Sequence, residues 1–181
     1  CLANVEYASP FDPKLQKIII DSEVSTFFKE RAQFYEMVID KIIRFVNEKP
    51  GNYLLFMPSY SYLKEIADRL ISRNAIKNLL VQEKNMSELD KDLFLKEFHK
   101  GEPVVGLSVM GGIFSEGIDL TGEKLIGVLI VGVGLPSPSA ENEILKQHFQ
   151  DRFEDGFGYA YLLPGFNKVL QTAGRLIRTE T

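Results

Sequence analysis

Short apolar runs separated by segments of helical periodicity constrain the fold of this chain more than any other feature. The runs cover residues 53–57, 79–81, 104–109 and 125–133. Because each run is apolar throughout instead of alternating with polar residues, each is expected to form a strand buried on both faces. Strands of this kind that alternate with helices build a parallel sheet covered by helices. The sequence therefore predicts an α/β fold, a three-layer sandwich with a mostly parallel sheet flanked by helices.

Segments with the spacing of amphipathic helices precede, separate and follow these runs. Apolar residues recur at helical spacing in residues 31–47, 62–71 and 144–153. Ser87 and Asp90 predict a capping box at the start of another helix, which would run to about His99. Residues 1–30 lack this organisation, although the isoleucines at 18–20 could form a short strand. We therefore expect residues 1–30 to be a linker segment and residues 31–181 to be one domain.

The composition is that of a folded domain and excludes several kinds of site. Of the 181 residues, 45% are hydrophobic and 25% are charged, which allows a core and argues against disorder. The net charge of −4 comes with no basic tail, so nucleic-acid binding would need a local groove. Cys1 is the only cysteine, which excludes an internal disulfide and a thiolate metal site. His99 and His148 lack partners at metal-ligand spacing, and no metal site is expected.

The sequence carries no sign of membrane insertion or export. No apolar run is long enough to span a bilayer, and no signal peptide is present. We therefore expect a cytoplasmic protein without membrane contact. The chain begins with Cys1 instead of Met, and we expect it to be a piece of a longer polypeptide.

Parallel sheets of this class carry their chemistry in the loops at the carboxyl ends of the strands. Those loops are the segments 59–60, 82–84, 110–119 and 134–138. The first two include Ser59, Tyr60 and Gln82. The role of the last segment stays open between a turn that shapes a binding edge and a plain structural turn.

The segment 110–119 is rich in glycine and carries polar side chains. Its notable residues are Met110, Gly111, Gly112, Ser115, Glu116, Gly117 and Asp119. Glycines allow positive φ and close backbone approach, and backbone amides in such a loop can hold phosphate oxygens. The loop is not a Walker A element, because no Gly-Lys-Ser/Thr follows. The alternative interpretation is a flexible strand-to-helix connection capped by its serine and aspartate.

A third pattern lies near the C-terminus. Gln171, Arg175 and Arg178 have spacings of four and three, which place them on one face of a helix. The opposite, apolar face would consist of Val169, Leu170, Ala173, Leu176 and Ile177. Gly174 lies close to the polar face and leaves room for a large ligand. Two arginines presented in this way suit a polyphosphate. The alternative is an ordinary surface helix.

Taken in order, these segments resemble a known set of motifs. The loop with Ser-Glu-Gly-Ile-Asp (115–119) and the helix with Gln-x-x-Gly-Arg-x-x-Arg (171–178) resemble motifs V and VI of superfamily 2 helicases. Residues 55–60 look like motif IV of the same proteins. Ser-Pro-Phe at 9–11 and Gln82 narrow the resemblance to the XPD/DinG type of DNA helicase, in its bacterial branch. The resemblance covers nearly the whole chain and implies a RecA-like fold.

In that family, two RecA-like domains bind ATP and Mg²⁺ between them and contact single-stranded DNA. The resemblance implies that this chain is the second of the two. Arg175 and Arg178 would be arginine fingers that reach the γ-phosphate, and Gln171 would position the nucleotide or the attacking water. Asp119 would orient an arginine or bind the ribose. Glu116, Gly117 and Gly174 would support the nucleotide site.

The same resemblance implies a DNA-facing surface. Ser59, Tyr60 and Gln82 would line the DNA path, and Tyr60 would stack on a base, with a tyrosine that merely closes a strand as the alternative. Ser115 and the backbone of Met110, Gly111 and Gly112 would face DNA phosphates. Partners would be single-stranded DNA and the first RecA-like domain of the same polypeptide. A monomeric helicase of 5′ to 3′ polarity with a role in DNA repair is implied.

The sequence also departs from the full family pattern. It has no Gly-x-x-x-x-Gly-Lys-Thr and no Asp-Glu-x-His sequence, so the isolated chain is expected not to hydrolyse ATP. An iron–sulfur cluster on four cysteines, common in the family, could lie only upstream of this chain. The alternatives are a non-motor nucleic-acid-binding or regulatory module on the same fold, and an unrelated doubly wound enzyme with its site in the glycine loop.

Overall fold

The computed structural model describes residues 17–114, 120 and 124–174. In these residues a parallel sheet is formed by β1 (Tyr53–Met57), β2 (Leu79–Val81), β3 (Val105–Val109) and β4 (Gly127–Ile130). The strand order is β2-β3-β1-β4, so β3 and β1 occupy the centre. In register, Tyr53 lies between Val105 and Gly127. The predicted α/β fold with a mostly parallel sheet is confirmed.

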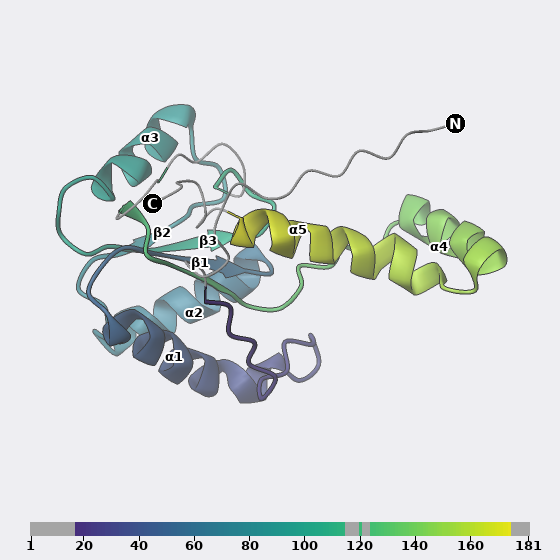
Figure 1. Cartoon of the computed structure of the whole chain (residues 1–181), viewed down its shortest axis with the longest axis horizontal. Helices are drawn as coiled ribbons and strands as arrows, with labels where there is room; N and C mark the ends of the chain where they lie inside the picture. The colour runs from purple at the N-terminus through teal and green to yellow at the C-terminus, as the bar shows by residue number, and fades with distance from the viewer. Residues whose placement is uncertain (1–16, 115–119, 121–123, 175–181) are drawn as a thin grey trace.

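Helices cover both faces of the sheet, as Figure 1 shows. One face carries α1 (Arg31–Glu48) and α2 (Tyr60–Ser72), and the opposite face carries α3 (Glu88–Glu97). A separate arm is built from α4 (Ala140–Phe153), a π-helical turn η3 (Gly158–Leu162) and α5 (Leu163–Ala173). The arm extends sideways from the sheet, and the end of α5 lies nearest to the strands (Figure 1).

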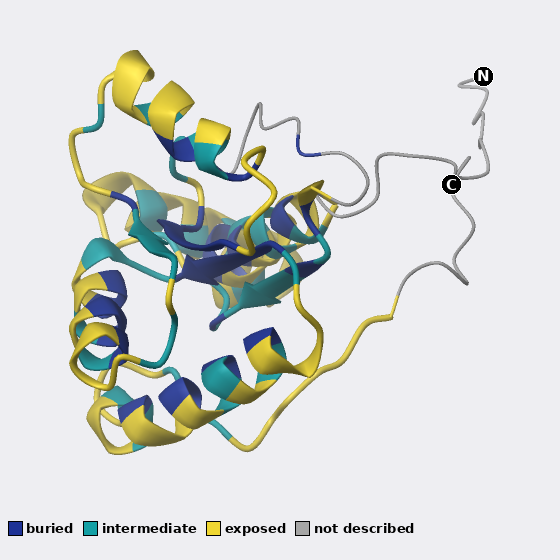
Figure 2. Cartoon of the chain, turned by 90° about the vertical axis from the view of Figure 1, so that its left-hand side faces the viewer, coloured by how far each residue is buried: buried dark blue, intermediate teal, exposed yellow. Residues whose placement is uncertain are grey.

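Successive residues of each central strand enter different cores, because side chains alternate across a sheet. Leu55 and Leu107 pack with α1 and α2, where Ile39, Ile42 and Ile66 are fully buried. Leu54 and Phe56, the alternate residues of β1, point to the other side of the sheet. There they form a second core with Phe94, Phe98 and Phe114. Figure 2 shows both central strands as buried along their length. This double burial explains why the strands are continuously apolar in sequence.

The strand predictions differ from the structure only at the ends. Residues 53–57 and 79–81 match β1 and β2, whereas 104–109 and 125–133 are longer than β3 and β4. In the described residues β4 pairs with β1 alone, and their last pair is Phe56 with Ile130. Gly132, at a φ of 71°, then turns the chain out of the extended conformation. The possible strand at 18–20 is wrong, since Ile18, Ile19 and Ile20 are unpaired and 71–88% exposed.

The predicted capping box at the start of α3 is confirmed. The Ser87 hydroxyl accepts a hydrogen bond from the Asp90 N–H, and the Asp90 carboxylate accepts one from the Ser87 N–H at 2.9 Å. The Ser87 hydroxyl also donates to the Asp90 carboxylate at 2.7 Å, and this bond, together with the one from the Ser87 N–H, lowers the pKa of Asp90 below its usual value. The cap therefore fixes the point at which the chain enters α3 after β2.

The helix predicted for residues 144–153 is present as α4, but its apolar residues do not reach a core. No residue of α4 is buried, and Ile144 is 70% exposed. Instead, Phe149, Phe153 and Tyr159 stack on one another with ring centroids 5.0–6.1 Å apart. The Tyr161 hydroxyl donates to Glu143 at 2.7 Å. These contacts hold η3 against α4 and stabilise the arm within itself.

None of the helices in the described residues is both long and apolar enough to cross a membrane. Within the same residues, no cluster of His, Cys, Asp and Glu side chains could hold a metal ion.

One buried side chain, Asn52, joins three segments at the amino end of the sheet. Its amide donates to the carbonyls of Phe98 at 3.0 Å and Lys124 at 2.9 Å, and its carbonyl accepts from the Val104 N–H at 2.9 Å. Buried peptide groups that lose their partners are costly. Asn52 therefore aligns the starts of β1, β3 and β4.

We predict that Asn52→Ala destabilises the fold by about 2–3 kcal/mol, because three peptide groups lose their partner. Asn78→Ala is the matched control. Its amide also binds two oxygens, those of Glu102 and Pro103, but in an exposed position. Urea unfolding followed by circular dichroism measures both variants. Equal losses in the two variants would contradict the role given to Asn52.

Candidate functional site

The carboxyl ends of the strands bring together three of the segments singled out in the sequence. Ser59 and Tyr60 follow β1, Gln82 follows β2, and the residues 110–112 follow β3. Because parallel strands end at the same edge, these segments become neighbours although they are distant in sequence. Hydrogen bonds between these segments join them into one connected surface.

Gln82 is the centre of this surface. It is only 2% exposed, and both ends of its amide are used. Its Nε2 donates to the Tyr60 hydroxyl at 2.8 Å, and its Oε1 accepts from the Val109 N–H at 2.9 Å. Its backbone N–H donates to the Leu107 carbonyl at 2.9 Å. Gln82 thus joins the segments after β1, β2 and β3.

The burial of Gln82 changes the interpretation of its role. The resemblance implies that Gln82 lines a DNA path, but both ends of its side-chain amide already bind protein groups. The structure therefore places Gln82 beneath the surface, where it orients Tyr60. Tyr60 itself is half-buried, so part of its ring remains accessible.

The start of the glycine loop is tightly held. The Met110 N–H donates to the Met57 carbonyl at 3.0 Å, and the Gly112 N–H donates to the Val109 carbonyl at 3.1 Å. Gly111 has a φ of 70°, which a residue with a side chain adopts only with strain. A Cβ on Gly112 would lie 3.0 Å from the Val109 carbonyl oxygen and 3.1 Å from Gln82 Nε2. Glycine is therefore favoured at position 111 by the backbone conformation and at position 112 by the close neighbours.

Met110 and Ser59 have structural roles at this edge. The Met110 side chain is buried, and its Cε lies 3.1 Å from the Cβ position of Gly134, which brings the loop after β4 into the same surface. Ser59 caps α2, since its hydroxyl accepts from the Tyr62 N–H at 3.3 Å. Neither the side chain nor the N–H of Met110 is therefore free for a ligand, whereas Ser59 is half-buried and remains partly accessible.

α5 carries the described part of the third sequence pattern. Gln171 is exposed on this helix, and Gly174 ends it with helical backbone angles. The apolar face differs from the prediction, because Thr172 is fully buried and Leu170 is 55% exposed. Thr172 tolerates burial because its hydroxyl donates to the Lys168 carbonyl at 2.7 Å. Val169 packs on the second core as expected.

Lys168 is a residue at this edge that the sequence interpretation missed. Its Cδ and Cε lie 3.6 Å, and its Nζ 3.8 Å, from the position that a Cβ on Gly111 would occupy. It stands three residues before Gln171 and seven before Arg175, so the same helical spacing could have identified it. The structure thus adds a cation beside the glycine loop.

Six of the predicted site residues lie outside the described residues. They are Ser115, Glu116, Gly117, Asp119, Arg175 and Arg178. Their roles stay predictions that rest on the sequence pattern.

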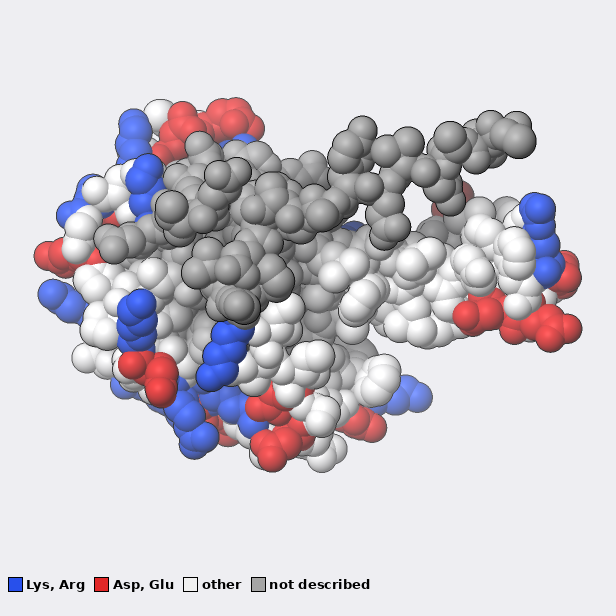
Figure 3. Space-filling model, in the orientation of Figure 1, with Lys and Arg blue, Asp and Glu red and all other residues white. Residues whose placement is uncertain are grey.

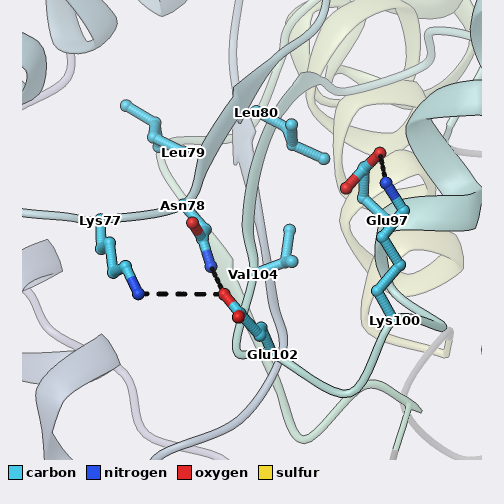
Figure 4. A pocket seen from close by; sticks show the side chains of 8 residues that line it. All are labelled: Lys77, Asn78, Leu79, Leu80, Glu97, Lys100, Glu102 and Val104. Atoms are coloured by element: carbon cyan, nitrogen blue, oxygen red, sulfur yellow. Dashed lines mark hydrogen bonds and ion pairs between the residues drawn. The ribbon is translucent and has the colours of Figure 1, made fainter.

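A hollow of about 740 Å³ lies at the opposite, amino end of the sheet. Figure 4 shows that its charged side chains are already paired. Lys100 binds Glu97 at 2.6 Å, and Asn78 donates to Glu102 at 3.2 Å. With these charges neutralised, the hollow offers less to a ligand than the carboxyl edge does.

The face of the molecule drawn in Figure 3 shows no broad basic patch among the described residues. In the view of Figure 3, the described Lys and Arg side chains alternate with Asp and Glu, and the flank of the arm is largely uncharged. A polyanion would therefore have to be recognised by a few placed groups. The carboxyl edge offers such groups, namely the Tyr60 ring, the loop backbone, Lys168 and Gln171.

Comparison with known proteins agrees with this geometry. The profile of the helicase C-terminal domain matches residues 42–181. A probable ATP-dependent helicase of Methanocaldococcus jannaschii is 30% identical over 95% of this chain and 28% of its own length. The ATP-dependent DNA helicase DinG of Photobacterium profundum is 25% identical over 96% of this chain and 25% of its own length.

A solved XPD helicase structure shares the fold. Its TM-score is 0.67 at 23% sequence identity, over 86% of this chain and 28% of that chain. This chain therefore spans about a quarter of the length of each of these three proteins. The predicted RecA-like fold is confirmed by this likeness.

We predict that Gly112→Ala destabilises the domain by about 1 kcal/mol or more, because the added methyl group would press on Gln82 and the Val109 carbonyl. Gly174→Ala is the matched control. Its Cβ would lie at an ordinary 3.4 Å from the Leu170 carbonyl, with a φ of −65°. The control should be neutral or slightly stabilising. Thermal unfolding measures the stability of both variants. A Gly112→Ala variant as stable as the parent would contradict the tight packing around Gly112.

Proposed function

The chain belongs to the helicase C-terminal domain family, and on this premise we propose that it is the second motor domain of an ATP-dependent DNA helicase of the XPD/DinG type. One observation carries the proposal. The polar segments after β1, β2 and β3 meet at one edge of the sheet, where Gln82 binds both the Tyr60 hydroxyl and the Val109 N–H. This edge is where a RecA-like domain can present loops to a nucleotide and a nucleic acid together.

The nucleotide would be met by α5 and the residues that follow it. Gln171 is exposed there, and the helical spacing of Arg175 and Arg178 continues its face. Two guanidinium groups beside a γ-phosphate stabilise the charge that builds up during phosphoryl transfer. Gln171 would position the nucleotide or the attacking water. Glu116, Gly117, Asp119 and Gly174 would complete this side of the site.

Mg²⁺ would take its protein ligands from the first RecA-like domain. No cluster of metal-ligating side chains lies in the described residues, and the chain lacks an Asp-Glu-x-His sequence. The chain also lacks the lysine of a Walker A element. ATP and Mg²⁺ would therefore bind jointly with a first RecA-like domain, and this chain alone would not turn over ATP. A single cysteine cannot ligate an iron–sulfur cluster, so any cluster would belong to that other part.

Single-stranded DNA would run across the carboxyl edge. Tyr60 offers a ring for stacking on a base, and the backbone of residues 110–112 together with Ser115 would face the phosphates. Of the three backbone N–H groups in residues 110–112, that of Gly111 is the one left free to donate within the described residues. Ser59 lies next to this path, and Gln82 supports it from below. Because the glycine loop meets both ligands, movement of the strand would be linked to the nucleotide site. The proposal includes a monomeric motor with 5′ to 3′ polarity and a role in DNA repair. It also includes a cytoplasmic location and membership of the bacterial branch of the XPD/DinG type.

A non-motor nucleic-acid-binding module is the second candidate, because the Tyr60 surface is independent of the arginines. Against it stands the retained Gln171-Arg175-Arg178 pattern, for which a binding module has no use.

The test is ATP hydrolysis by the full polypeptide that carries this domain, with and without single-stranded DNA. We predict DNA-stimulated turnover that falls about 10³-fold in Arg178→Ala. Arg44→Ala, a change on the exposed side of α1, is the control and should keep full turnover. Turnover unaffected by Arg178→Ala would remove the finger role, and no turnover in the parent would favour the non-motor module.

For Tyr60, we predict that Tyr60→Ala weakens binding of an oligo(dT) strand by about 1–3 kcal/mol, the usual value of one base–aromatic stack. Tyr60→Phe keeps the ring but loses the hydroxyl that binds and orients it through Gln82, so it should lose less affinity than Tyr60→Ala. Fluorescence anisotropy measures both. Equal affinity in Tyr60→Ala and the parent would show that no base stacks there.

A further inference from the structure

Lys168 projects from α5 over the start of the glycine loop. Its side chain passes Gly111 so closely that Cδ, Cε and Nζ all lie within 3.8 Å of the position of a Cβ there. The residue is half-buried, because its stem lies against the loop. α5 is itself fixed at this point. Gly165 packs against the Val133 carbonyl, and Thr172 is fully buried one turn after Lys168.

This placement sets Lys168 apart from the cations that serve the fold. Lys41, Arg69 and Arg73 bind carboxylates of neighbouring segments. Among the described residues, by contrast, no carboxylate forms an ion pair with Lys168. Because the methylene chain of Lys168 already lies beside the loop, the side chain loses less entropy than a free lysine would when its ammonium binds a ligand.

The loop beneath offers a complementary donor. The Gly112 N–H is already bound to the Val109 carbonyl, but within the described part of the chain no protein group accepts from the Gly111 N–H. With a φ of 70°, Gly111 presents its exposed backbone beside the lysine stem. An ammonium close to a residue whose peptide N–H is free is a combination that suits a tetrahedral oxyanion.

We propose that Lys168 and the backbone of Gly111 form a phosphate-binding subsite. The inference rests on the proposed function, since it adds a residue to the same carboxyl edge. The phosphate has two possible sources, the backbone of a single-stranded DNA and the phosphate chain of the nucleotide. Lys168 has the spacing that continues the Gln171-Arg175-Arg178 face, and it also lies over the loop that would follow the DNA.

Glycine at position 111 suits this backbone conformation. A side chain there would be strained by the positive φ, and its Cβ would be in ordinary contact with the Lys168 stem at 3.6 Å. Glycine therefore leaves the space beside the Lys168 stem free of a side chain.

The test is Lys168→Met in the full polypeptide, measured with oligo(dT) and with ATP. If the phosphate belongs to DNA, affinity falls about tenfold at low salt, and the slope of log K against log salt falls in magnitude by about 0.7, the value of one phosphate contact on a single strand. The KM for ATP then stays unchanged. If the phosphate belongs to the nucleotide, the KM for ATP rises and the DNA slope is unchanged.

Two variants keep this test specific. Lys168→Arg retains the charge and should keep most of the binding. Lys77→Met removes an 87% exposed lysine at the opposite end of the sheet and should change neither quantity. Thermal melting verifies that Lys168→Met is folded.

Each remaining outcome is decisive. A folded Lys168→Met with unchanged salt slope and unchanged KM overturns the subsite and leaves the proposed function intact. If Lys77→Met has the same effect as Lys168→Met, the loss of binding comes from the net charge of the protein, and the subsite is also overturned. A parent that binds neither oligo(dT) nor ATP overturns the proposed function together with the subsite.

Discussion

The two hydrogen bonds of the buried Gln82 amide are the interaction on which the carboxyl edge of this domain depends. The parallel sheet brings three loops to one edge, but it does not fix their side chains relative to one another. Gln82 does so, since it donates to the Tyr60 hydroxyl and accepts from the Val109 N–H. An amide that is 2% exposed cannot exchange these partners for water at low cost. The ring of Tyr60 and the start of the glycine loop are thereby held as one surface.

This arrangement would link the proposed nucleic-acid surface to the proposed nucleotide surface through a short path. The Met110 N–H is bound to the end of β1, and Gly111 lies under Lys168 of α5. α5 also carries Gln171, at the start of the face that Arg175 and Arg178 continue in sequence. A displacement of the glycine loop would therefore also displace α5, the helix that would face the nucleotide. Such linkage is what a motor domain needs and what a passive binding module does not.

Much of the fold could be predicted from the sequence, because the strands are buried on both faces and therefore read as continuous apolar runs. The capping box of Ser87 and Asp90 was equally predictable, since both partners lie within one turn. The arm was not: the apolar side chains of α4 pack on the aromatic residues of η3 instead of on the core, and helical periodicity cannot distinguish the two. For the site, the order of the motifs predicted which loops matter. The burial of Gln82 and the position of Lys168 depend on contacts between distant segments, which no local pattern contains.

The central claim, that the carboxyl edge is the ligand-binding face, is tested most directly by hydrogen–deuterium exchange. The full polypeptide would be compared with and without oligo(dT) and a non-hydrolysable ATP analogue. We expect protection of peptides that cover residues 59–60, 110–112 and 168–171, with no change around the hollow formed by residues 77–80 and 97–104. Protection at the hollow, or none at the carboxyl edge, would contradict the account.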